Sequence, residues 1–273
     1  MPAIDVIGHK AHAAILVAGG RARVISRTTT ALWLQAGDAI VWLGGGGMLH
    51  PRAMIATTPS AVDGDVVDLD VATARVWRPP ALDLDRERAA MLTRGATGLR
   101  VTLSALGEPD GLARLLVADA PPPTGILAAV LARAAPRIEA LAAACRADRA
   151  VDAVEPAVAL LGLGPGLTPA GDDFVGGLLF ARRLLATADV ADAAAWRDTA
   201  DAVVRAARER THPISAALLG DLAAGESHAA LHDLVAQLAT GADPLDAARR
   251  LARIGHSSGW DILAGALCGF ATR

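Results

Sequence analysis

Residues 162–173 read Gly-Leu-Gly-Pro-Gly-Leu-Thr-Pro-Ala-Gly-Asp-Asp and introduce a helix that the sequence predicts to be largely apolar. Thr168 and Pro169 suit an N-cap and a first helical position, because threonine accepts from free N–H groups and proline presets the helical φ. Asp172 and Asp173 follow in the first turn. The stretch therefore predicts a glycine loop with free N–H groups and two acids at one helix start. We interpret it as the active or binding centre.

Composition limits the class of protein. The 273 residues carry a net charge of −3 with acids and bases interspersed, which argues against a nucleic-acid footprint. Hydrophobic residues make up 53% of the chain, but no apolar run reaches the roughly 18 residues of a membrane helix. Residues 1–5 lack the basic-then-apolar pattern of a signal peptide. We expect a soluble, cytoplasmic protein without a membrane partner.

Several common kinds of site are missing from the sequence. Lys10 is the only lysine, so there is no Walker A loop and a lysine Schiff base is disfavoured. Leu167 breaks the dinucleotide fingerprint, and no Gly-x-Ser-x-Gly elbow occurs. No Cys/His spacing resembles a zinc site, and Cys145 and Cys268 are expected to be buried free thiols.

The first 107 residues predict a β-rich domain, a sandwich or small barrel, because short apolar runs alternate with glycine, proline and aspartate. A short helix is expected over 83–93. The expected strands cover residues 14–17, 24–26, 32–34, 39–43, 54–57, 66–69, 73–77 and 99–103.

The rest of the chain predicts helices almost throughout, so the fold class is α+β. Residues 108–123 are expected to form a linker and residues 124–273 an all-helical bundle. Pro136 and Pro156 are expected to kink or divide the first two helices. The expected helices cover residues 124–147, 150–160, 168–186, 192–210, 213–223, 227–239, 244–254 and 258–271.

Four glycines, Gly44 to Gly47, could cradle an anion through their backbone N–H groups. A flexible hairpin connection is the alternative that the sequence favours, since no basic or hydroxyl residue is fixed beside them. His50 follows them and could reach a site, although a loop histidine is more often solvated.

The last helix repeats the start of the central one. Residues 171–179 align with residues 259–267, which pairs Asp173 with Asp261. Both helices carry small residues one turn in, at 176–177 and at 264–265. Glycine within a helix costs about 1 kcal/mol relative to alanine, and close approach of another backbone is the usual compensation. The repeat predicts that these helices cross at their small residues and bring both N-termini to one pocket; chance similarity is the alternative.

A third polar cluster, Thr211-His212-Pro213-Ile214-Ser215, separates two helical patterns. Its hydroxyls could reach the site, and His212 is held extended by the proline that follows. An ordinary helix–helix turn with a cap is the simpler interpretation.

Helix N-termini favour anions, whereas paired acids favour hydrogen-donating groups. Together they suit a ligand with an anionic end and an NH or NH₂ end. A phosphate held through Mg²⁺ is the alternative, and no resident cofactor or metal is expected. A single acid could equally serve only to stabilise the helix dipole. A nucleophile–base pair of Ser257 or Ser258 with His256 is disfavoured, since adjacent residues at a helix start rarely face each other.

The stretches 162–173, 211–215 and 255–261 together resemble the AllH family, over roughly residues 155–273. The resemblance implies a subunit of oxamate carbamoyltransferase, from anaerobic allantoin breakdown, that transfers a carbamoyl group between carbamoyl phosphate and oxamate or a related small amide or carboxylate. It also implies partner subunits. Ala170 stands where the family would have serine and His212 where a second threonine is common, and either change could alter a hydrogen bond.

Carbamoyl phosphate and oxamate each have an anionic end and an NH₂ end, which agrees with the kind of ligand that the residues predict. A non-catalytic metabolite-binding or assembly subunit is the second hypothesis. We expect catalytic carboxylates at Asp172, Asp173 and Asp261, and substrate contacts from Gly164, Gly166, Thr168, Thr211, Ser215, His256 and Ser257.

Overall fold

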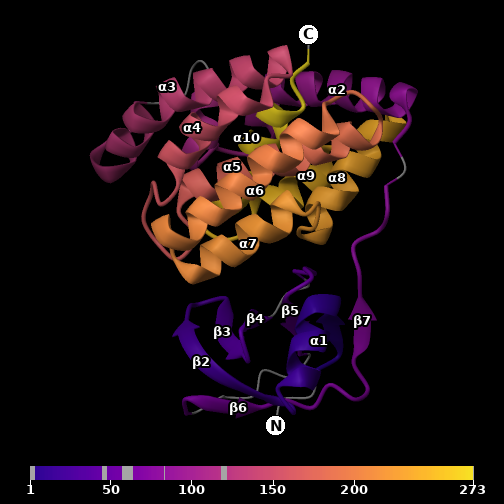
Figure 1. The fold of residues 1–273 in the computed structure, drawn as a ribbon, viewed down its shortest axis with the longest axis vertical. Helices are drawn as coiled ribbons and strands as arrows, with labels where there is room; N and C mark the ends of the chain where they lie inside the picture. Colours follow the sequence, from indigo (N-terminus) through magenta and orange to yellow (C-terminus); the bar gives the residue numbers. More distant parts are fainter. Residues whose placement is uncertain (1–3, 45–47, 57–63, 83, 118–121, 273) are drawn as a thin grey trace. The chain divides into compact units, whose positions relative to one another are not determined.

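The computed structural model describes residues 4–44, 48–56, 64–82, 84–117 and 122–272, which form two compact units (Figure 1). Unit 1 comprises Met1–Pro80 with Ser227–Ala229, and unit 2 comprises Ala81–Glu226 with Ala230–Arg273. The predicted boundaries at residues 107 and 124 concern domains that fold independently. Compactness does not test independent folding, so these boundaries stay predictions.

The described residues of unit 1 form one open sheet of seven strands in the order β6-β2-β3-β4-β5-β1-β7. The pairs β4–β5 and β1–β7 are parallel and the other pairs are antiparallel. The mixed α and β class is confirmed, but the predicted sandwich or small barrel is not, because the strands make a single open sheet. The strands are β1 (Val6–Gly8), β2 (Arg21–Arg27), β3 (Ala31–Ala36), β4 (Ala39–Gly44), β5 (Ala53–Ile55), β6 (Val66–Asp68) and β7 (Arg75–Trp77).

Helix α1 (His9–Val17) packs on this sheet and closes its core. Ile15 lies on α1 and is fully buried with Leu34, Val41 and Met54 of the strands. The strand predicted over residues 14–17 is therefore wrong. A short apolar run does not distinguish a strand from a buried helical turn. Here successive turns of a helix bring Ala11 and Ile15 to the sheet.

Unit 2 is helical, and the predicted helices of residues 124–273 are confirmed within a few residues at each end. Pro136 and Pro156 lie inside α3 and α4 and divide neither helix. The helices are α2 (Arg86–Val101), α3 (Gly125–Ala147), α4 (Ala150–Leu160), α5 (Ala170–Thr187), α6 (Ala193–Arg210), α7 (Pro213–Ala223), α8 (Ala229–Thr240), α9 (Leu245–Ala252) and α10 (Ser258–Gly269), with short 3₁₀ turns η1 (Leu103–Leu106) and η2 (Gly111–Leu116).

Helix α2 corrects the strand predicted over residues 99–103. Asp85 caps the helix by accepting a hydrogen bond from the Arg88 N–H at 2.8 Å. Ala89, Leu92 and Leu99 are buried at helical spacing, so one face of the helix is apolar up to its last turn. The helix expected over 83–93 is therefore present and simply continues further.

Helices α5 and α10 cross in direct backbone contact, as the internal repeat predicts (Figure 1). A Cβ on Gly265 would collide with the carbonyl oxygen of Phe174, and one on Gly177 would collide with that of Ile262. A Cβ on Gly269 would lie 2.6 Å from the Leu178 carbonyl oxygen. Glycine is needed here because the helix backbones themselves touch.

Cys145 and Cys268 are buried free thiols, as predicted. Among the described residues, no helix has both the length and the apolar character needed to cross a membrane.

Candidate functional site

The glycine loop ends one residue later than the sequence predicts. Pro169 has φ −54° and ψ 140°, so its ψ is extended and helix α5 begins at Ala170. Thr168 is therefore not the N-cap. Its hydroxyl instead lies 3.0 Å from the Ser258 hydroxyl at the start of α10, which places the two helix starts side by side.

Asp172 joins three segments of unit 2. Its Oδ1 accepts the Gly162 N–H at 2.8 Å, and its Oδ2 accepts the hydroxyls of Thr211 and of Ser215, the latter at 2.6 Å. The side chain is 1% exposed. Burial raises the pKa of Asp172, whereas these hydrogen bonds lower it. The structure thus brings Thr211 and Ser215 to the glycine loop, but through a carboxylate whose oxygens are already bonded.

Asp173 is buried beneath the same helix start and is 4% exposed. Its Oδ2 has no hydrogen-bond partner among the described residues. Burial first, and then the negative charge of Asp261, raise the pKa of Asp173 well above its usual range, although a hydrogen bond with the Ser258 hydroxyl lowers it. Burial therefore favours the protonated form of Asp173, which has an O–H to donate.

Asp261 is the matching acid at the start of α10, and no part of it is exposed. Its Oδ1 accepts the Leu112 N–H at 2.6 Å, whereas its Oδ2 has no hydrogen-bond partner in the described part of the chain. Burial raises the pKa of Asp261 to about 7, against the hydrogen bonds from Leu112 and Ser257. Gly111, at φ +54°, leaves the room that this carboxylate occupies.

His256 does not join the cluster. Its side chain is 99% exposed, and its Nε2 lies 3.7 Å from Asp110 Oδ2. The interpretation of His256 as a pocket residue thus has no support from these contacts. Its neighbour Ser257 does reach the cluster, through its hydrogen bond to Asp261.

Gly164 and Gly166 both have positive φ, at +121° and +95°, where other residues are strained. Within the described residues, no backbone hydrogen bond is formed by the N–H groups of Gly164, Gly166, Leu167 or Thr168. The loop therefore presents several free donors next to a helix N-terminus, which is the arrangement that suits an anion.

Ser258 and the turn η2 are the parts of the cluster that sequence reasoning missed. Ser258 links Thr168 to Asp173, and it lies in the quoted stretch 255–261, so its hydroxyl was available as a signal. Leu112 lies 149 residues from Asp261, and nothing in its own sequence marks it as a partner.

The Gly44–Gly47 loop falls largely outside the described residues, since only Gly44 belongs to them. His50 is 2% exposed rather than solvated. Its ring packs 4.7 Å from that of Trp42 and 4.6 Å from that of His228, all within unit 1. The described residues contain no group of three or more histidine, cysteine, aspartate or glutamate side chains that could hold a metal ion.

Residues 160–270 match the AllH family, described as oxamate carbamoyltransferase subunit AllH. The resemblance predicted from the sequence is thereby confirmed over these residues, which contain both helix starts. No curated protein and no solved structure matches the chain.

Asp173 and Asp261 each keep a buried oxygen without a hydrogen-bond partner among the described residues, and the AllH match covers both acids. Two carboxyls with raised pKa values near each other can divide the roles of acid and base. The AllH description names a subunit, which implies partner chains.

Proposed function

We propose that this chain is a subunit of a carbamoyltransferase that acts on carbamoyl phosphate and on oxamate or a related small amide or carboxylate. The observation that carries the proposal is the pair of buried, unpartnered carboxyl oxygens on Asp173 and Asp261, inside the region that matches AllH. A buried polar atom without a partner costs free energy, so a ligand that pairs with it compensates a cost already present in the free protein.

The proposed reaction divides the work between the two helix starts. The nitrogen of oxamate attacks the carbamoyl carbon, a C–N bond forms, the C–O bond to phosphate breaks, and the nitrogen loses a proton. Asp261, with a pKa of about 7, suits the base that takes this proton. The protonated form of Asp173, which burial favours, donates a hydrogen bond to a substrate oxygen. The free N–H groups of Gly164, Gly166, Leu167 and Thr168 hold the anionic end.

Access to these acids passes through two hydroxyls. Thr168 and Ser258 are half-buried, whereas Asp173 and Asp261 are buried, so these two hydroxyls are more accessible to solvent than the two acids. We expect the substrate to replace the Thr168–Ser258 hydrogen bond as it enters. Asp172, which already accepts three hydrogen bonds, holds the loop in shape instead of reacting.

The first prediction concerns Asp173→Asn. Burial raises the pKa of Asp173 and favours its uncharged form, which the amide resembles in shape and charge, so the melting temperature should change little. Carbamoyl transfer should fall by about 100-fold or more, the usual effect of losing an acid–base group. The measurement is oxamate-dependent phosphate release from carbamoyl phosphate by the chain together with its partner subunits.

Asp198→Asn is the matched control, since Asp198 is exposed on α6 and lies outside this cluster. It should leave both turnover and melting temperature unchanged. Full turnover by Asp173→Asn would exclude the proposed role of the acid pair. A large loss of thermal stability in that variant would point to a structural role instead.

The bonding of Asp172 and Asp261 to hydroxyls and main chain favours a second candidate function. Here the chain binds a metabolite or holds an assembly together, and the chemistry takes place on other chains. Carbamoyl transfer by the purified chain alone would exclude this candidate. Protection against heat by carbamoyl phosphate, without turnover in any combination of subunits, would favour it over the first.

A further inference from the structure

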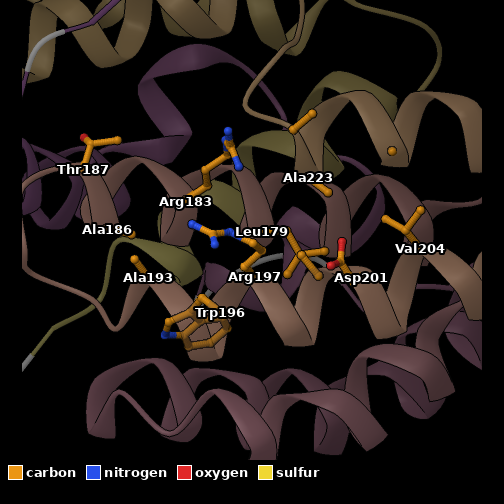
Figure 2. Close-up of a pocket in the computed structure, with 13 residues that line it drawn as sticks. Leu179, Arg183, Ala186, Thr187, Ala193, Trp196, Arg197, Asp201, Val204 and Ala223 are labelled. Carbon is orange, nitrogen blue, oxygen red and sulfur yellow. The ribbon is translucent and has the colours of Figure 1, made fainter.

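A second region of unit 2 is shaped to take a ligand. A cavity of about 490 Å³ lies between helices α5, α6 and α7 (Figure 2). Cavities of this size are typical of sites for small molecules. None of the residues discussed above for the acid cluster lines it.

Two arginines give this cavity its charge. Arg183 of α5 and Arg197 of α6 both line it, and both side chains are exposed (Figure 2). Neither forms a hydrogen bond or an ion pair with any other residue in the described ranges. Asp201, the one acid in the lining, likewise forms no ion pair there, so the lining keeps a net positive charge.

Trp196 forms a rigid part of the cavity lining. Trp196 lines the cavity and is 3% exposed. Its Nε1–H donates to Asp148 Oδ1 at 2.7 Å, and the guanidinium of Arg182 lies 4.6 Å from the centre of its ring. Arg182 also pairs with Asp148, so the indole is fixed before any ligand arrives.

A glycine in the lining leaves space in the cavity. Gly220 lies inside α7 and lines the cavity, although glycine is destabilising inside a helix relative to alanine. Apart from the backbone of its own helix, the nearest described atom to a Cβ added there would be Val204 Cγ1, at 4.0 Å. Packing within the described chain thus does not require this glycine, in contrast to Gly177 and Gly265.

We propose that this cavity binds a small phosphate-bearing ligand through Arg183 and Arg197. The guanidinium group offers a planar fork of donors that matches phosphate oxygens, and two such forks without protein partners share one cavity. The fixed indole and the small side chains of α6 and α7 leave an apolar surface for the rest of the ligand. This site is separate from the acid cluster and does not depend on the proposed carbamoyl transfer.

The test uses isothermal titration calorimetry of the full chain with pyrophosphate and with ADP, at low ionic strength because salt screens exposed charges. We expect saturable binding by the unaltered chain. Arg183→Gln and Arg197→Gln should each weaken it by about tenfold or more, as for the loss of a charge-assisted hydrogen bond. Arg133→Gln, an exposed arginine of α3 outside the cavity, is the matched control and should bind as the unaltered chain does.

Gly220→Leu provides a second variant that leaves the charges in place. Its side chain enters open space, so the protein should fold and lose binding. Equal affinities for pyrophosphate and ADP would show that the site recognises the phosphate groups alone. A tenfold preference for ADP would show that the apolar surface also contacts the ligand. Both results support the proposal. Absence of saturable binding at millimolar concentration, or an equal loss in Arg133→Gln, would overturn it.

Discussion

Asp172 is a buried carboxylate that fastens the glycine loop to the start of α7. It accepts hydrogen bonds from the Gly162 N–H and from the hydroxyls of Thr211 and Ser215. Asp172→Ala leaves these three donors without their acceptor, and an unpaired buried donor costs about 1–3 kcal/mol. We expect a loss of about 3 kcal/mol in the free energy of unfolding, since partial hydration offsets some of the sum.

A loss of this size lowers the melting temperature of a chain this long by about 6–12 °C. Thermal unfolding followed by circular dichroism measures it. Thr211→Val removes only one of the three hydrogen bonds and should cost clearly less. An equal effect of the two substitutions would show that Asp172 does not join the three segments.

At this scale the sequence predicts the members of the cluster better than their roles. The acids and hydroxyls of residues 168–173, 211–215 and 257–261 were identifiable because polar groups at a helix start need a reason. That Asp172 is fully bonded and Asp173 is not depends on partners as far away as residues 211 and 258. The sequence does not distinguish the roles of two adjacent acids, because these roles depend on the direction in which each side chain leaves the helix.

The crossing of α5 and α10 yields a prediction about elements. Gly265→Ala should gain about 1 kcal/mol of helix propensity and yet destabilise the protein, because its Cβ would strike the Phe174 carbonyl oxygen. Overpacking of this kind typically costs 1–3 kcal/mol in total. Gly220→Ala, also inside a helix, meets no such obstacle and should stabilise by up to about 1 kcal/mol.

The two alanine variants should thus shift the melting temperature in opposite directions. Chemical denaturation gives the free energy of unfolding for each and distinguishes a change in stability from a change in the denatured state. A shift of the same sign in both would mean that the backbones of α5 and α10 are not in contact.

Helices and strands were predictable where the apolar residues repeat over a segment long enough to show their period. The helices from α3 onward follow a 3.6-residue pattern with clear ends, and their limits agree with the sequence. The errors, at residues 14–17 and 99–103, are runs of four or five residues that fit either structure. Strand β1 (Val6–Gly8) was missed, because three residues carry no period and its pairing partners lie near residues 55 and 76.

At the scale of the whole molecule, the open sheet of unit 1 could not be distinguished from a sandwich or barrel. Each has short strands separated by turns, and the difference lies in whether the edge strands meet. The parallel pair β1–β7 depends on contacts between segments distant in sequence. The family match, in contrast, lies within residues 160–270, where the local signals are strongest.

The free energy of unfolding of the whole chain should depend on pH in a way that reveals the raised pKa of Asp261. Its pKa is about 7 in the folded protein and about 3.9 in an unfolded chain. Between these values the unfolded state is ionised while the folded state keeps its proton, so stability falls as pH rises from 4 to 7. His232 acts in the opposite direction, because burial lowers its pKa to about 4 and its stability contribution grows with rising pH.

Comparison with Asp261→Asn separates these effects, since His232 is present in both proteins. The amide oxygen can still accept the Leu112 N–H, but the side chain no longer ionises. Relative to the unaltered protein, the variant should gain stability from pH 5 to pH 7, by at most ~3 kcal/mol, and the difference should level off above pH 7. Melting temperatures at half-unit pH steps measure it. A difference that stays constant across this range would mean that Asp261 ionises in the folded protein as it does in the unfolded chain, and would remove it as a base suited to neutral pH.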